Sequence, residues 1–247
     1  ANKNLEIIDL KNERILTQIP LDDVAKDVDL DANTNMAYVS SQNANTIYCV
    51  DLNSARLERA IRLEQSPSRL AVSSDGTSIV FVDGVSGELF TLQLGENTQV
   101  NPVAKTKNIS RVLCDSNFIY AISRTQNKMF VYDRNTLALV DEENLNEKPV
   151  DAIMYRGKIY ILCAKEGVLE VYDSEQKKVI LSTQLDSDGF YSKITLIPDQ
   201  HNVIITGVNS KKFLLFDLEK MTLIKKQPAL IDVSNIVIMD KTPVQDL

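Results

Sequence analysis

The chain has 247 residues, of which 44% are hydrophobic and 25% charged, a globular composition that excludes wholesale disorder. Its 34 acidic and 27 basic side chains give a net charge of −7, which disfavours nucleic acid as a partner because duplex-binding proteins show the opposite balance. No apolar run in the sequence reaches the roughly 18 residues needed to span a bilayer.

Six segments of the sequence share one pattern, an alternating apolar strand that ends in a polar residue and enters a turn. Their last residues are Asp9, Asp51, Gln93, Asp133, Asp173 and Asp217, separated by 42, 42, 40, 40 and 44 residues. A carboxylate at this place can accept hydrogen bonds from backbone N–H groups two residues on, which starts a tight turn. A period near 40 residues with four short strands per unit predicts β-propeller blades.

The predicted elements begin with two strands, Leu5–Asp9 and Ile15–Ile19. Five periods of four strands follow, over residues 24–63, 68–103, 108–145, 149–185 and 192–228. In the third period the fourth strand is expected at Leu137–Val140. Two further strands are predicted at the end of the sequence, Asn235–Met239 and Pro243–Leu247.

No amphipathic helix is apparent, so the expected fold is all-β with four-stranded antiparallel blades. The two terminal strand pairs, within residues 4–20 and 233–247, predict one split blade that closes a ring of six. We therefore expect a single domain over residues 1–247. The short segment before the first strand is compatible with one domain of a larger protein.

The blades resemble the YVTN family of propeller repeats, also called surface-layer-type or NHL-like repeats. The segments Ala37–Asn43 and Thr46–Asp51 follow that family's "YV-x-N" and "V-x-V-I-D" strands, and Ser66–Gly76 follows its proline and aspartate-glycine hairpin. The repeat is WD40-like in period but lacks the WD40 motif, since the chain has no Trp and the residue before His201 is not Gly. The resemblance implies a binding platform, in many cases outside the cytoplasm.

The predicted binding residues lie in loops. Phe190 and Tyr191 are adjacent aromatics in a polar connection, and they are interpreted either as an interface anchor or as a cover over the core. The connections between second and third strands supply Arg124, Lys165 and Lys211, a mildly cationic patch suited to an acidic peptide or carbohydrate.

A lactonase- or hydrolase-like enzyme with a site in the central channel is the alternative. Such a site needs carboxylates on the first strands, where the sequence offers Asp27 and Asp29. Glycine-rich phosphate loops and the G-x-S-x-G elbow are absent from the sequence. The leading hypothesis is therefore a non-catalytic scaffold that binds a protein partner and needs no cofactor or metal.

Three further features are interpreted as structural. Cys49, Cys114 and Cys163 have no metal-ligand spacing and are expected to be buried and unpaired, which favours a reducing compartment and leaves the localisation open against the family resemblance. His201 is expected to be a solvated turn residue. The run Asp186–Gly189 matches part of a calcium loop and is expected to be a plain turn.

Overall fold

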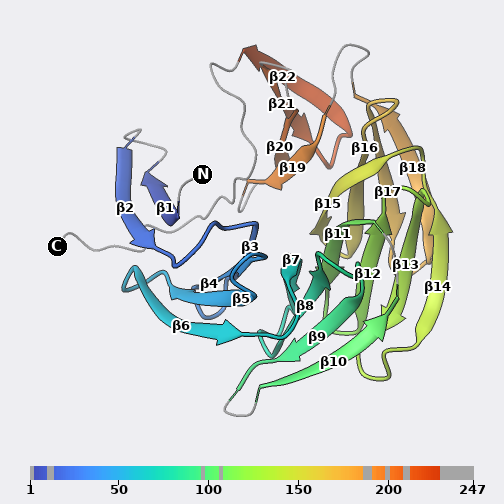
Figure 1. Cartoon of the computed structure of the whole chain (residues 1–247). Helices are drawn as coiled ribbons and strands as arrows, with labels where there is room; N and C mark the ends of the chain where they lie inside the picture. The colour runs from blue at the N-terminus through green and yellow to red at the C-terminus, as the bar shows by residue number, and fades with distance from the viewer. Residues whose placement is uncertain are drawn as a thin grey trace. The chain divides into compact units, whose positions relative to one another are not determined.

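The computed structural model describes residues 3–9, 14–95, 98–105, 108–185, 191–197, 201–207 and 212–228. Every regular element within these ranges is a β-strand, and the strands form six antiparallel sheets (Figure 1). The described residues fall into two compact units. Unit 1 contains β1 to β10 and residues 114–117; unit 2 contains residues 108–113 and β12 to β22.

Unit 1 contains one two-stranded sheet and two four-stranded sheets, which we call blades. The two-stranded sheet pairs β1 (Asn4–Asp9) with β2 (Arg14–Pro20). Blade 1 consists of β3 (Asp27–Asp31), β4 (Met36–Ser41), β5 (Thr46–Asp51) and β6 (Arg56–Arg62). Blade 2 consists of β7 (Pro67–Val72), β8 (Ser78–Asp83), β9 (Leu89–Gln93) and β10 (Gln99–Ala104).

Three blades make up unit 2, and in each the strands are paired in chain order. Blade 3 consists of β11 (Ile109–Cys114), β12 (Phe118–Ser123), β13 (Lys128–Asp133) and β14 (Leu139–Asn144). Blade 4 consists of β15 (Pro149–Tyr155), β16 (Lys158–Cys163), β17 (Val168–Asp173) and β18 (Lys178–Gln184). Blade 5 consists of β19 (Lys193–Leu196), β20 (Asn202–Thr206), β21 (Lys212–Asp217) and β22 (Thr222–Pro228).

The core of each unit lies between neighbouring blades. In unit 1, Ile47 of blade 1 packs with Leu70 and Phe81 of blade 2; in unit 2, Tyr120 of blade 3 packs with Tyr172 of blade 4. The two middle strands of a blade are covered on both faces, which is why they are nearly continuous apolar runs. The fourth strands of blades 1, 3 and 4 are mostly exposed.

The predicted role of the repeated Asp is confirmed where its side chain is described. One carboxylate oxygen accepts backbone N–H groups two or three residues on, as in Asp51 with Asn53 at 2.8 Å and Asp133 with Thr136 at 2.8 Å. Asp173 and Asp217 do the same. Four residues after each of these carboxylates the backbone turns left-handed, with φ between 51° and 58° at Ala55, Leu137, Lys177 and Met221.

The sheet of β1 and β2 is the outer half of a blade. In blades 1, 3, 4 and 5 a β-bulge interrupts the pairing of the third and fourth strands one to two residues before the repeated Asp. A shift at the same place, between Ile7 and Ile8, precedes Asp9. The strands expected to complete this blade, Asn235–Met239 and Pro243–Leu247, lie outside the described residues, and the single-domain boundary stays a prediction.

Candidate functional site

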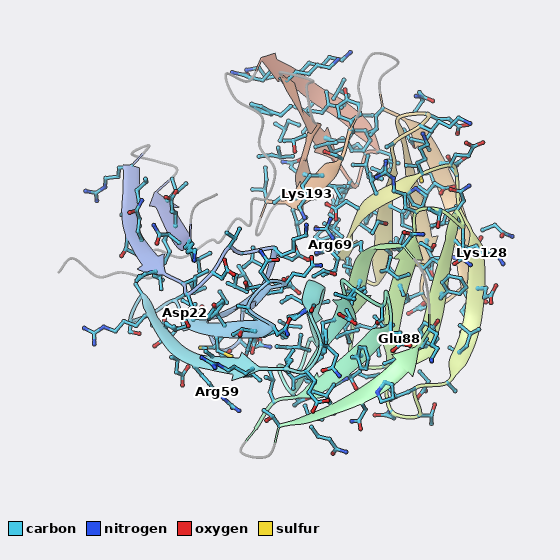
Figure 2. The ribbon with its side chains drawn as sticks, in the orientation of Figure 1. Asp22, Arg59, Arg69, Glu88, Lys128 and Lys193 are labelled. Carbon is cyan, nitrogen blue, oxygen red and sulfur yellow. The ribbon has the colours of Figure 1, made fainter. Side chains whose placement is uncertain are left out.

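The first strand of each of blades 1 to 5 carries a charged residue at the same register. These residues are Asp27, Arg69, Arg111, Asp151 and Lys193, spaced by 42, 42, 40 and 42 residues. Where the pairing is described, each is opposite the fifth residue of the second strand, such as Ser40 for Asp27 and Leu162 for Asp151. Figure 2 labels two of them, Arg69 on β7 and Lys193 on β19.

In unit 1, carboxylates of β3 bond to the backbone of β7. Asp27 Oδ2 accepts the Leu70 N–H at 3.2 Å, and Asp29 Oδ2 accepts the Val72 N–H at 2.9 Å. Asp27 is only 3% exposed. Both carboxylates that the hydrolase alternative requires are therefore engaged in holding two neighbouring first strands together.

In unit 2, one carboxylate links three first strands. Asp151 accepts the Ile194 N–H at 3.0 Å and lies 3.5 Å from Arg111 Nε and 3.3 Å from Lys193 Nζ. Arg111 Nε also donates to the carbonyl oxygen of Ala152 at 3.3 Å. All three charged side chains are less than one-fifth exposed. The cluster is charge-assisted and well shielded, which is the arrangement of a structural clamp.

Arg124 and Lys165 lie in exposed turns at the same end of blades 3 and 4. Arg124 lies in the turn between β12 and β13, and its N–H donates to the carbonyl oxygen of Asn108, just before β11, at 3.1 Å. Lys165, in the turn between β16 and β17, forms an ion pair with Glu147. The hydrogen bond to Glu147 raises the pKa of Lys165.

Two predicted site residues, Phe190 and Lys211, lie outside the described residues, as does the run Asp186–Gly189. Tyr191 is described, and its prediction as an exposed interface anchor is wrong. It is 1% exposed and packs with Ile194, Leu214 and Phe216 in the core of unit 2. Tyr191 therefore covers the core, which is the other interpretation that the sequence allowed.

The same end of blades 3 and 4 carries a further cation, Lys148, which was not predicted from the sequence. Lys148, in the connection from β14 to β15, is exposed, and its N–H donates to Asn127 Oδ1 at 2.9 Å. Asn127 closes the turn that contains Arg124, so the backbone of Lys148 is fixed to that turn. Within the described part of the chain, the side chains of Arg124 and Lys148 form no ion pair.

We call this surface, residues 124–127, 145–148 and 164–167, the loop face of unit 2. Its exposed charges are Arg124, Lys148 and Lys165 against Glu147 and Glu166. Because Lys165 is paired with Glu147, the unpaired cations are concentrated beside the turn between β12 and β13. Of the residues predicted to form a cationic patch, Arg124 and Lys165 lie on this face together with Lys148, and the patch itself stays a prediction.

The three cysteines are buried, as expected, and none is in a disulfide bond. Burial raises the pKa of the Cys49 thiol to about 11, and burial followed by the nearby Glu170 raises that of Cys163. His201 is 40% exposed, with Nε2 3.4 Å from Asp217 and Nδ1 3.8 Å from Glu219. Among the described residues no three His, Cys, Asp or Glu side chains are grouped to hold a metal ion. The described part of the chain also contains no helix able to cross a membrane.

Comparison with known proteins identifies the fold. The structure is similar to Kuenenia stuttgartiensis hydrazine synthase, with a TM-score of 0.72, 12% identity and coverage of 92% of this chain and 81% of that one. It is also similar to the β-propeller domain of Myceliophteria thermophila Cps50 (Swd1), with a TM-score of 0.73, 8% identity and coverage of 92% and 80%. No model of a protein family and no curated protein sequence matches the chain.

The chain therefore has the β-propeller fold, with five complete blades and the outer half of another among the described residues. At these identities the likeness shows the fold alone.

Proposed function

We propose that this propeller is a non-catalytic platform that binds an acidic segment of a partner protein on the loop face of unit 2. The observation that carries the proposal is the pair of exposed, unpaired cations, Arg124 in the turn between β12 and β13 and Lys148 in the connection that is hydrogen-bonded to that turn. Loops on a rigid scaffold are the usual place for recognition, because they vary without disturbing the core.

The first strands support a non-catalytic function. A channel hydrolase requires carboxylates that are available to a substrate or a metal, whereas Asp27, Asp29 and Asp151 accept backbone N–H groups of the next blade. The finer assignment to YVTN-type repeats belongs to this proposal and is supported by the strand segments Ala37–Asn43 and Thr46–Asp51.

The chemistry of the surface defines the expected partner. Exposed cations contribute mainly to the rate of encounter and to specificity, so binding should weaken as salt is raised. A glutamate- or aspartate-rich extended segment matches a surface with two unpaired cations.

The test compares immobilised wild-type chain with the double variant Arg124→Glu, Lys148→Glu in affinity capture read by mass spectrometry. The matched control is Arg56→Glu, Lys225→Glu, which changes the same number of exposed charges away from the loop face. We expect a stoichiometric acidic partner that the loop-face variant loses and the control retains. A partner captured equally by all three proteins, or no protein partner at all, would contradict the proposal.

A further inference from the structure

Glu170 is a buried carboxylate at a position that is apolar in the other complete blades. It lies on β17, three residues before the last residue of the strand, and is 5% exposed. At the same distance from the end of the third strand, the other four complete blades carry the buried side chains Tyr48, Phe90, Phe130 and Leu214. Burying a carboxylate costs free energy unless hydrogen-bond donors compensate it, so packing alone does not account for a glutamate here.

The donors to Glu170 come chiefly from the connection between blades 3 and 4. Asn146 donates twice, from its backbone N–H to Oε2 at 2.9 Å and from Nδ2 to Oε1 at 2.7 Å. The thiol of Cys163, on the neighbouring strand β16, donates to Oε2 at 3.4 Å. Asn146 Nδ2 also lies 3.4 Å from Ser182 Oγ on β18. Glu170 therefore ties the connection over residues 145–148 to the middle of blade 4.

The two ends of this connection are held by other groups. Asn127 of blade 3 accepts the Leu145 N–H at 2.8 Å through its carbonyl oxygen and the Lys148 N–H at 2.9 Å through Oδ1. The Ala164 N–H of blade 4 donates to the carbonyl oxygen of Lys148 at 2.9 Å. The bonds to Glu170 supply the hold between these two ends, directly before the residues that face solvent.

Lys148 has a backbone conformation that lysine disfavours. Its φ is 58°, in the left-handed region, which costs free energy for a residue with a Cβ atom. Asn108, the equivalent residue 40 positions earlier, has a φ of 57°, and asparagine adopts this region more readily. Strained residues persist where the surrounding structure determines their conformation, and they gather at ligand-binding sites. A lysine at this position thus favours a use for its side chain and requires that its backbone be held.

We propose that Glu170 is a positioning residue of the loop face: by holding Asn146, it fixes the backbone from which Lys148 projects. The inference rests on the proposed function, because the acidic segment proposed above is the ligand of Lys148. Glu170 itself is buried and does not touch that segment. A cation on a fixed backbone loses less conformational freedom on binding. Removing Glu170 should therefore weaken binding although Arg124 and Lys148 are unchanged.

The test measures binding of a fluorescently labelled deca-glutamate peptide to the full chain by anisotropy at low salt. Glu170→Leu introduces the residue that blade 5 has at this position, and replacing a buried charge by an apolar side chain is often neutral for stability. The Tm should thus stay within about 3 °C of wild type, while the affinity for the peptide falls about fivefold, the cost of ordering one long side chain. The matched control is Glu175→Leu, in the exposed turn between β17 and β18. Both variants remove one negative charge, which by itself favours an acidic probe, so a fall confined to Glu170→Leu has no electrostatic explanation.

Hydrogen exchange measures the connection directly. In Glu170→Leu, the amides of residues 146–148 should exchange at least about tenfold faster than in wild type, with those of β16 unchanged. Glu170→Gln keeps the side-chain volume and one acceptor oxygen, so exchange and affinity should change in the same directions by less. Lys148→Asn should keep the slow exchange, because asparagine accepts the left-handed backbone, but lose affinity for the peptide.

The outcomes separate this inference from the proposed function. Unchanged exchange at residues 146–148 overturns the inference, as does an affinity that stays within about twofold of wild type after exchange has risen. A fall in Tm of more than about 10 °C in both Glu170 variants also overturns it, because Glu170 then serves folding. If wild type does not bind the peptide, or Lys148→Asn binds it equally well, the proposed function fails, and the inference fails with it because the connection then presents no binding group.

Discussion

Replacing Asp151 by alanine tests whether the first-strand clamp holds unit 2 together. The change removes the acceptor of the Ile194 N–H and leaves Arg111 and Lys193 without their shared counter-ion. Since these cations are only 12% and 17% exposed, water replaces the carboxylate poorly. Removing one partner of a buried ion pair costs roughly 3–5 kcal/mol, and in a chain of this length the low end lowers Tm by about 10 °C.

The conservative variant separates the two components of this loss. Asp151→Asn keeps an oxygen that can accept the Ile194 N–H but removes the negative charge, so we expect about half the effect of alanine. The double variant Asp151→Ala, Lys193→Ala should be less destabilised than the sum of its single variants, because it leaves one fewer unpaired cation, with a coupling of at least about 1 kcal/mol.

The assay is thermal and urea unfolding followed by far-ultraviolet circular dichroism, because the chain has no Trp whose fluorescence could report unfolding. Glu166→Ala is the control, because Glu166 is exposed and lies on the loop face. If Asp151→Ala unfolds within about 1 kcal/mol of the control, the buried cluster contributes little and the clamp interpretation is refuted.

Two further predictions concern the turns and the thiols. Leu137→Gly and Lys177→Gly, at φ of 58° and 51°, should each raise the free energy of unfolding by about 0.5–1 kcal/mol in urea titrations, because glycine adopts the left-handed region without strain; a loss of stability would contradict this. Because Cys49, Cys114 and Cys163 are buried and burial raises the pKa of Cys49 to about 11, none should react with a thiol reagent at pH 8 until the chain unfolds. Fast labelling of one thiol in the native protein would show that its burial is wrong.

The repeat could be predicted from the sequence because two strong signals coincide in each blade. The middle strands are apolar on both faces, and the Asp that follows the third strand fixes where its turn begins. The fourth strand was less predictable. Leu137–Val140 was expected as a strand, but Leu137 lies in the left-handed turn and β14 runs from Leu139 to Asn144. Because β14 is an exposed edge strand, it can contain the acidic residues that follow Val140. The hydrophobic pattern of such a strand therefore does not show where it begins and ends.

The site was predictable only in part, because its contacts join residues about 40 positions apart. Nothing local distinguishes a loop tyrosine that binds a partner from Tyr191, which covers the core of unit 2. The clamp left a signal that the periodicity could have revealed, since Arg69, Arg111 and Lys193 recur at the spacing of the blades. The spacing does not show which group each side chain contacts, for example that Asp27 accepts a hydrogen bond from the Leu70 N–H.

The charged position that the first strands share, occupied by Asp27 in blade 1 and Arg111 in blade 3, has a consequence for which charges these strands can carry. An acid there accepts an N–H of the next strand, as Asp27 does with Leu70, and a base donates to a C=O, as Arg111 does with Ala152. Because a strand edge offers both groups, either sign of charge can make the link. The electrostatic potential along the first strands can therefore be reversed, blade by blade, while the number of inter-blade hydrogen bonds is kept. In such a framework, affinity for cations or anions is free to diverge without loss of the fold.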